Sequence, residues 1–326
     1  MNFEFIEKVW EGLIRRAESL PHALLIHGPR GTGKLALARR FSNFLLCEST
    51  PETRPCGRCG ACRWLADGNH PDFRLIQPEA LAEESGEPAD ASEGSENTGK
   101  KTKPSLEIKV AQIRALAEFL YVGSHRGARR IALVHPAEAM NPNTANALLK
   151  ALEEPPAGAV FILVTHALAR LLPTVRSRCV KIPVAIPDLE SASKWLKGNG
   201  IQESSRWLRW SGGAPLLAQE IAQGERAAEL QRLIDTLAAG QRPAGIQTRE
   251  SLELLVEVLQ KMAFDAAISG FSGQSRYGTW GNRSPSGSPE RWLAFARGMG
   301  RQRAMARRPV NAMLFSEELL NRFPGL

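Results

Sequence analysis

The feature that most constrains the fold is a glycine-rich loop, Gly28-Pro-Arg-Gly-Thr-Gly-Lys34, between the apolar run Ala23 to His27 and a helical pattern that begins near Leu35. Glycines let backbone N–H groups curl around phosphate oxygens, while the lysine and the helix N-terminus add positive charge. A glycine turn that only joins a strand to a helix is the alternative. The context favours the phosphate-binding loop called Walker A. The predicted nucleotide cradle consists of Gly28, Gly31, Thr32, Gly33, Lys34 and Leu35.

The loop lacks groups that ATP hydrolysis requires. In Walker A loops a Ser or Thr after the lysine binds Mg²⁺, and here that position is Leu35. A neighbouring strand usually ends in an Asp that positions the metal, but the run Ile131 to Val134 is followed by His135. Thr32 lies inside the loop, so we do not expect it to replace the missing hydroxyl, although substitution by Thr32 or by water is the alternative; we interpret Glu138 as a surface residue. The sequence predicts a loop that can bind ATP or ADP but hydrolyses little ATP.

A cysteine cluster forms the second site. Four of the five cysteines lie between residues 47 and 62 with the spacing C-x8-C-x2-C-x2-C. Four thiolates can close a tetrahedral shell, which is the donor set of structural Zn²⁺. Reduced free thiols and an iron–sulfur cluster are the alternatives. The predicted ligands are Cys47, Cys56, Cys59 and Cys62, and we interpret the remaining Cys179 as a buried, apolar-like residue.

Up to about residue 185, short apolar runs alternate with helical patterns. This alternation predicts an α/β domain with a mostly parallel sheet. The expected strands are Ala23 to His27, Phe73 to Gln77, Arg130 to His135, Val160 to Thr165 and Val180 to Pro183. Helical spacing of apolar residues predicts helices over Ala111 to Tyr121 and Asn143 to Glu154.

One segment interrupts this pattern. Glu79 to Gly99 contains seven acidic residues and no basic or aromatic ones. Such a composition buries too little apolar surface to offset the entropy of ordering. We therefore predict a flexible surface insertion over residues 79–104, with a regulatory acidic patch as the alternative.

Strand signals end after Pro187. We expect a small helical domain over residues 188 to about 240, a linker near Ala239 to Gly245, and a helical C-terminal domain. The helices expected in the C-terminal domain are Ser251 to Ala267, Glu290 to Ala306 and Asn311 to Arg322, with a loop from Phe271 to Pro289.

Composition is that of a globular protein, with 43% hydrophobic and 23% charged residues. No apolar run reaches membrane-spanning length, so we expect no membrane association. The first residues carry acids instead of a basic leader, so we expect no secretory signal and a cytoplasmic location. The formal charge of +8 favours an anionic polymer as a partner.

Several motifs together resemble the clamp-loader subunits of bacterial DNA polymerase III, which are AAA+ proteins. The resemblance rests on the phosphate loop with the cysteine cluster after it, Asn146-Ala-Leu-Leu-Lys-Ala-Leu-Glu-Glu-Pro-Pro156, Arg176-Ser-Arg-Cys179 and Arg308-Pro-Val-Asn-Ala-Met-Leu-Phe-Ser-Glu-Glu-Leu-Leu320. It implies a RecA-like AAA+ domain with a zinc module over residues 1–186, a helical lid over 187–240, and a helical collar over 246–326 that holds a pentameric ring together.

Two branches of this family share the zinc module, the ATP-hydrolysing tau/gamma type and the delta-prime type. The missing metal ligands at Leu35 and around His135, and the lack of a long tau extension, favour the delta-prime type. The segment Gly212 to Leu217 also lacks the arginine that AAA+ lids carry to sense the γ-phosphate. In the delta-prime type the Ser-Arg-Cys motif supplies an arginine finger to the ATP site of the adjacent subunit, a role that maps onto Arg178. A surface salt-bridge residue is the alternative interpretation of Arg178.

The resemblance thus predicts a non-motor subunit that works with tau/gamma and delta subunits in a hetero-pentameric ring. Through that ring it is expected to meet the sliding clamp and primer-template DNA, as part of a polymerase holoenzyme but without polymerase activity of its own. One competing hypothesis is an active tau/gamma-type ATPase of the same loader. Another is a zinc-dependent nucleic-acid-binding protein that uses Arg54, Arg58 and Arg63.

Overall fold

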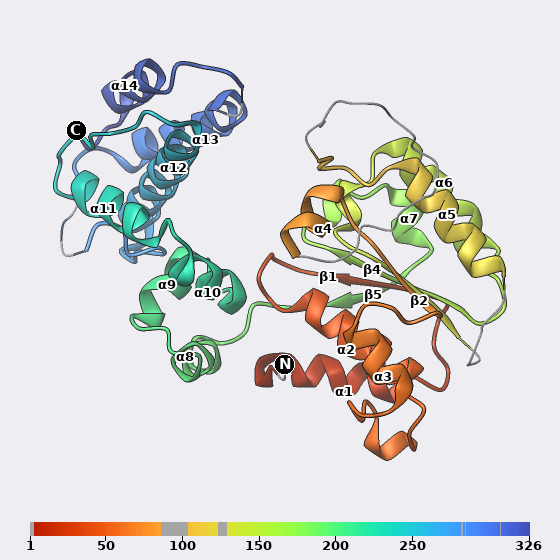
Figure 1. Ribbon diagram of the computed structural model, residues 1–326. Coiled ribbons are helices and arrows are strands. Elements are labelled where there is room, and N and C mark those ends of the chain that lie inside the picture. The colour runs from red at the N-terminus through yellow and green to blue at the C-terminus, as the bar shows by residue number, and fades with distance from the viewer. Residues whose placement is uncertain (1–2, 86–103, 123–128, 282, 284, 307) are drawn as a thin grey trace. The chain divides into compact units, whose positions relative to one another are not determined.

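The computed structural model describes residues 3–85, 104–122, 129–281, 283, 285–306 and 308–326. Contacts divide the chain into two compact units, Met1–Pro187 and Asp188–Leu326, both drawn in Figure 1. Within the described ranges, no helix combines the length and the apolar character needed to cross a membrane.

The first unit is built on a five-stranded sheet with the strand order β2-β3-β4-β1-β5. All neighbouring strands run parallel. The strands are β1 (Ala23–His27), β2 (Phe73–Ile76), β3 (Arg130–Val134), β4 (Ala159–Thr165) and β5 (Val180–Pro183). The prediction of a parallel α/β fold is confirmed, and each expected strand is found with its ends shifted by no more than one residue.

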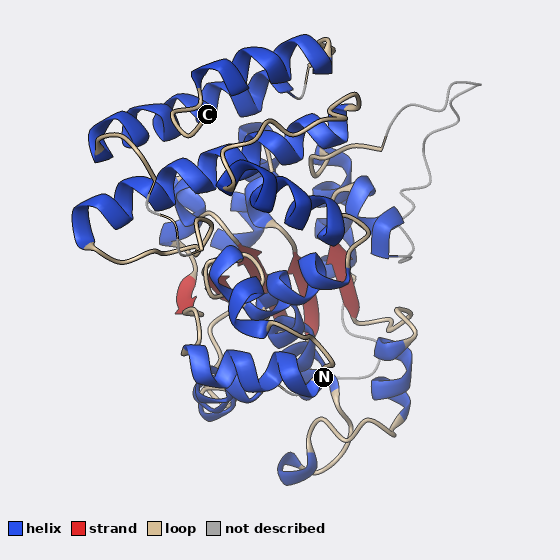
Figure 2. Ribbon diagram, turned by 90° about the vertical axis from the view of Figure 1, so that its left-hand side faces the viewer, coloured by secondary structure: helices blue, strands red, loops and turns tan. Residues whose placement is uncertain are grey.

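Helices cover both faces of this sheet, as Figure 1 and Figure 2 show. The helices of the first unit are α1 (Glu7–Arg15), α2 (Lys34–Leu46), α3 (Gly60–Ala66), α4 (Glu79–Ser85), α5 (Val110–Tyr121), α6 (Pro142–Glu153) and α7 (Pro173–Ser177). Short 3-10 helices are η1 (Glu4–Ile6), η2 (Pro51–Thr53), η3 (Ala137–Ala139) and η4 (Leu168–Arg170). Strand side chains alternate between faces, so Leu25 and Leu163 join the core under α5, α6 and α7. Helix α2 contacts β1, β3 and β4.

Parallel strands bring their carboxyl ends to one edge of the sheet. The glycine-rich loop follows β1, His135 follows β3 and His166 follows β4. Since β3, β4 and β1 are consecutive in the sheet, these three points lie side by side. The fold therefore gathers at one edge residues that are far apart in the sequence.

The start of the acidic insertion differs from the prediction. Residues Glu79–Ser85 form helix α4, and Ala82 in it is buried. The expectation of a flexible segment from residue 79 is therefore wrong for these seven residues. The remaining predicted insertion up to residue 103 lies outside the described residues.

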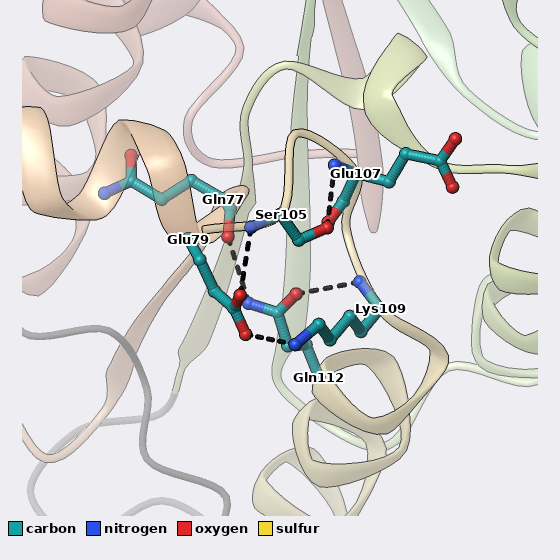
Figure 3. Close-up of polar contacts among 6 residues, drawn as sticks. All are labelled: Gln77, Glu79, Ser105, Glu107, Lys109 and Gln112. Atoms are coloured by element: carbon teal, nitrogen blue, oxygen red, sulfur yellow. Dashed lines mark hydrogen bonds and ion pairs between the residues drawn. The ribbon is translucent and has the colours of Figure 1, made fainter. Parts of the chain in front are cut away.

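Polar contacts from beyond the insertion explain this order (Figure 3). The backbone N–H of Ser105 donates to Glu79 Oε2 at 3.1 Å, and the Lys109 ammonium forms an ion pair with Glu79 Oε1. Gln112 Nε2 donates to the carbonyl of Gln77 at 3.0 Å, and Gln112 Oε1 accepts from Lys109 N–H at 2.9 Å. Composition of the acidic segment alone cannot predict contacts whose partners lie more than 20 residues away.

Within its described residues, the second unit has only helical secondary structure. Its helices are α8 (Leu189–Gly198), α9 (Ser204–Trp210), α10 (Pro215–Gln223), α11 (Ala227–Ala238), α12 (Arg249–Ser272), α13 (Pro289–Ala306) and α14 (Ala312–Arg322). Helices α8 to α10 share a small core with Leu196 and Leu208. Helix α11 instead buries Leu233 and Leu237 in the larger core of α12 to α14. The predicted C-terminal helices are present, while the division into a lid and a collar at residue 240 stays a prediction.

A buried carboxylate orders the segment that joins α12 to α13. Asp265 is 0% exposed and accepts hydrogen bonds from the backbone N–H groups of Arg276, Tyr277 and Thr279 at 2.7 to 2.9 Å. The hydroxyls of Ser275 and Thr279 also donate to it, at 2.9 to 3.0 Å. The predicted loop is therefore irregular but anchored, because its donors converge on one acceptor.

Candidate functional site

The glycine-rich loop after β1 requires its glycines. Gly28 has φ 152°, and a Cβ added there would lie 2.0 Å from the carbonyl oxygen of Val184. Gly31 and Gly33 have φ values of 78° and 85°, in the left-handed region that disfavours side chains. Helix α2 begins directly after Gly33. The loop thus has the strand, turn and helix N-terminus that a phosphate cradle uses.

Lys34 is folded back into this loop. Its side chain is buried, 2% exposed, and Nζ donates to the carbonyl oxygen of Pro29. Thr32 is fully buried and its Oγ1 donates to the same carbonyl at 3.0 Å. Burial lowers the pKa of Lys34 to about 8, while the negative charge of Glu138 acts in the opposite direction. Thr32 is already engaged inside the loop, so its hydroxyl is not displayed beside the half-buried Leu35.

Two imidazoles meet where a metal-binding carboxylate would be expected. His135 Nε2 lies 3.2 Å from His166 Nε2, and the rings are edge to face with centroids 5.2 Å apart. One Nε2 must therefore carry the shared proton while the other accepts it. Neither Nδ1, both of which are buried, has a partner among the described residues.

The histidine pair is held neutral by its surroundings. Burial lowers the pKa of both rings to about 4. The positive charges of Lys34, Arg39 and Arg30 act in the same direction, and Glu138 opposes them at His135. At neutral pH the carboxyl ends of β3 and β4 therefore present uncharged imidazoles, which attract a divalent cation less than an Asp would.

Glu138 corrects one expectation from the sequence. Its side chain is half-buried, and Oε1 accepts a hydrogen bond from the backbone N–H of His166 at 2.9 Å. The interpretation of Glu138 as a surface residue is wrong, because η3 (Ala137–Ala139) turns it toward the end of β4. Its carboxylate binds the backbone of the histidine pair and stabilises the charged form of Lys34.

The four cysteines predicted as ligands come together. Cys47 follows α2, Cys56 lies in the next loop, Cys59 caps α3 and Cys62 lies in its first turn. Their Sγ atoms all lie within 4.8 Å of one another, with Cys47 to Cys59 and Cys56 to Cys62 each at 3.9 Å. Tetrahedral Zn–S bonds of about 2.3 Å imply sulfur separations of about 3.8 Å. The group can hold a metal ion.

The thiols of the cluster differ in acidity. A hydrogen bond from Ser49 lowers the pKa of the Cys56 thiol to about 5, while burial raises that of Cys62 to about 12. Without a cation the set would therefore mix thiolate and thiol forms. A bound divalent ion is what would hold all four sulfurs as thiolates.

Arg54, one of the arginines in the nucleic-acid alternative, has a structural contact. Its Nε donates to the carbonyl oxygen of Ser49 at 2.7 Å, which braces the loop between Cys47 and Cys56. Arg54 thus helps to shape the cysteine cluster.

Arg178 lies directly after α7, next to the end of α6. Arg178 Nη1 donates a hydrogen bond to the carbonyl oxygen of Thr174 at 2.9 Å, and Nη2 forms an ion pair with Glu153 Oε1. The arginine side chain is 34% exposed and the glutamate 48%. The guanidinium is therefore reachable from solvent and is held by a carboxylate of the same unit.

Comparison with known proteins gives the family. The model described as "DNA polymerase III, delta subunit" matches residues 6–188, more than half of the chain. The chain belongs to the DNA polymerase III delta subunit family. The DNA polymerase III subunit delta' of Pseudomonas aeruginosa is 39% identical over 225 residues, which is 68% of this chain and 61% of that protein. The subunit delta' of Escherichia coli is 33% identical over 220 residues, 67% of this chain and 59% of that protein.

The chain thus spans about six tenths of the length of these delta-prime relatives. Among solved structures, a DNA polymerase III gamma subunit-related protein of Thermotoga maritima is 19% identical. The alignment covers 97% of this chain and 98% of that one, with a TM-score of 0.47. The segment matched by the delta family model contains the glycine-rich loop, the cysteine cluster and Arg178.

Sequence reasoning missed His166 and Glu153 and misinterpreted Glu138. His166 and Glu138 line the end of β4 and η3, and Glu153 holds Arg178. A usable signal existed for His166, since it directly follows a predicted strand. Glu153 gave no such signal, because its partner is 25 residues away along the chain.

Proposed function

We propose that the chain is a non-motor, delta-prime-type subunit of the DNA polymerase III clamp loader, which takes part in loading the sliding clamp on primed DNA. One observation carries this proposal: the phosphate loop is fully formed, but the side chains around it are poor ligands for Mg²⁺. Leu35 offers no oxygen ligand, and the neutral pair His135 and His166 stands at the carboxyl ends of β3 and β4. Mg²⁺ prefers oxygen ligands, so this pocket is poorly equipped to neutralise charge on a reacting phosphate.

In this proposal the contribution of the chain to catalysis is Arg178. A planar guanidinium offered across a subunit interface stabilises the charge that spreads over a transferring phosphoryl group. The partial exposure of Arg178 and its position after α7 suit such a donation. The reaction itself would occur at the ATP site of an adjacent tau/gamma-type subunit.

Glu153 would act as a holder for this arginine. Its carboxylate pairs with Arg178 in the single chain, which fixes the direction of the guanidinium before assembly. Engagement of a neighbour's triphosphate would exchange one carboxylate partner for phosphate oxygens. A charged hydrogen-bonding partner would therefore be present in both states.

We assign the cysteine cluster to structural Zn²⁺. The donor set of four sulfurs and their separations support this assignment, and a closed set leaves no position for a substrate. Zinc would fix the loop between α2 and α3 and would take no part in phosphate chemistry.

The proposed partners are tau/gamma and delta subunits in a hetero-pentameric ring, with the sliding clamp and primer-template DNA met through that ring. The proposed domains are an AAA+ domain over residues 1–186, a lid over 187–240 and a collar over 246–326. The proposed location is the cytoplasm.

The test is ATP hydrolysis by a loader reconstituted from this chain with tau/gamma and delta subunits, in the presence of primed DNA and the clamp. Arg178→Ala should lower the rate at the neighbouring site by a large factor, since arginine fingers contribute about 10³ to 10⁵ elsewhere. Arg176→Ala, which removes the same charge two positions away, is the matched control and should stay close to wild type. An unchanged rate with Arg178→Ala would refute the finger assignment.

The competing ATPase hypothesis has its own measurement. Turnover of ATP by the isolated chain, abolished by Lys34→Ala, would favour an active tau/gamma-type subunit over the proposal. Our expectation is no turnover above background in either protein, because metal ligands are missing beside Lys34.

A further inference from the structure

Helix α13 carries a concentration of positive charge that the nucleotide site does not use. The sequence from residue 276 to residue 308 contains eight arginines and one acidic residue, Glu290. Arg297 and Arg301 are exposed and four positions apart, so they share one face of α13. Arg291 near the helix start and Arg308 just after its end are exposed as well. We name these four residues the arginine face.

This charge has no internal counterpart. Three exposed arginines elsewhere in the second unit have carboxylate partners: Arg242 with Glu317, Arg249 with Glu253, and Arg322 with Glu318. Within the part of the chain that the structure describes, no acidic side chain forms an ion pair with Arg291, Arg297, Arg301 or Arg308. Like charges four apart on a helix repel each other, so the arginine face lowers the stability of the free helix. An external anion would relieve that repulsion.

Glycines lie between the arginines. Gly298 and Gly300 are exposed inside α13, and a Cβ added at either would meet no heavy atom within 4 Å. Glycine inside a helix costs stability relative to alanine, and no close packing within the described chain requires it here. The exposed neighbours Ala294 and Ala304 are also small. The arginines therefore project from a low surface that another backbone can approach closely.

The opposite side of α13 fixes this surface in place. Trp292, Ala296 and Met299 are buried in the core that α13 shares with α12, its neighbour in Figure 1. The arginine face consequently cannot turn inward without breaking that core.

We propose that the arginine face of α13 binds the phosphate backbone of double-stranded nucleic acid. Arginine suits phosphate because its fork of donors matches two oxygens. Exposed positions of α13 hold no aromatic side chain on which an unpaired base could stack, which argues against a single strand. A protein partner would need apolar anchors near the centre of the contact. Between Arg297 and Arg301 stand Gly298 and Gly300, and the exposed Met305 lies only in the last turn of α13.

The spacing also suits a phosphate backbone. Four helical residues rise about 6 Å, which is close to two phosphate steps of about 3.4 Å each along one strand. The surface is chemically selective for regular, closely spaced negative charge, and it would carry no information on base sequence.

The test is fluorescence anisotropy with the full-length chain and a short labelled duplex of mixed sequence, titrated over a range of salt concentrations. Arg297→Ala with Arg301→Ala should weaken binding by at least about tenfold and reduce the salt slope by about two. The matched control is Arg249→Ala with Arg322→Ala, which removes the same net charge from paired arginines and should change affinity by less than about twofold. Arg297→Lys with Arg301→Lys keeps the charge and should retain most of the affinity.

Several results would overturn the proposal. Equal losses in the control and in the Arg297/Arg301 variant would mean that only net charge matters. Tighter binding of the corresponding single strand, or more effective competition by polyglutamate than by unlabelled duplex, would assign the face to a different partner. Circular dichroism of each variant separates lost binding from lost folding, and the lysine variant keeps the test decisive if the alanine variant unfolds.

Discussion

The histidine pair beside the phosphate loop makes the first unit sensitive to acid. Protonation of His135 or His166 would place a cation in a buried site that already faces Lys34, Arg39 and Arg30, with Glu138 as the opposing charge. We therefore predict that unfolding of this unit becomes easier as the pH falls, and that replacing both histidines by glutamine removes much of that effect.

The size of the effect follows from the pKa values. Each imidazole goes from a pKa of 6.5 when unfolded to about 4 in the fold. Between these two pKa values the unfolded chain binds more protons than the folded chain, so the free energy of unfolding rises with pH. The contribution of the histidine pair is fully present above about pH 6.5 and is lost as the pH falls toward 4. At 1.36 kcal/mol for each pH unit, one isolated ring would contribute at most about 3.4 kcal/mol. Two independent rings would contribute twice that amount. Partial exposure and the coupling between the two rings reduce their combined contribution to about 3 kcal/mol.

The assay is urea unfolding followed by circular dichroism, at about pH 7 and about pH 4.5. The loss of unfolding free energy between these conditions should be smaller by about 3 kcal/mol in His135→Gln/His166→Gln than in wild type. His22→Gln is the control, since His22 bonds the Leu152 carbonyl away from the pair. Parallel pH profiles for wild type and the double variant would refute the reasoning.

Three further predictions concern zinc, the buried Asp265 and helix α4. Metal analysis of the purified chain should find zinc, and Cys59→Ser should reduce both zinc content and melting temperature; undiminished zinc in that variant would contradict the assignment. Asp265→Ala should destabilise the second unit by about 2 to 4 kcal/mol in urea unfolding, because several buried donors lose their acceptor, with Asp265→Asn milder; a change below about 0.5 kcal/mol would be inconsistent. Glu79→Ala should speed hydrogen exchange in α4 and leave exchange in α5 unchanged, since the contact of Glu79 with Lys109 is partly exposed and worth at most about 1 kcal/mol. Equal exchange rates of α4 in the wild type and in this variant would contradict the expectation.

Strands and the phosphate loop were predictable because their signals are local. Apolar runs such as Ala23 to His27 and Val160 to Thr165 are bounded by turns, and the glycines of the loop are needed for its own backbone. The proximity of the four cysteines was predictable for the same reason, since they lie within one short segment.

Contacts across the fold were not predictable in this way. The meeting of His135 and His166 depends on β3 and β4 being neighbours, which the sheet order decides. The role of Asp265 depends on a loop that returns ten residues later. Glu79 is ordered by Ser105 and Lys109, on the far side of the insertion. Single-sequence patterns carry little information on such pairings.

In the proposed function the chain keeps a phosphate loop, yet it contributes Arg178 to the ATP site of a neighbouring subunit. The most direct measurement compares ATP hydrolysis by the reconstituted loader containing Lys34→Ala with that containing Arg178→Ala, under identical conditions. The account predicts a nearly unchanged rate for Lys34→Ala and a strongly reduced rate for Arg178→Ala. A strong loss with Lys34→Ala and none with Arg178→Ala would contradict it.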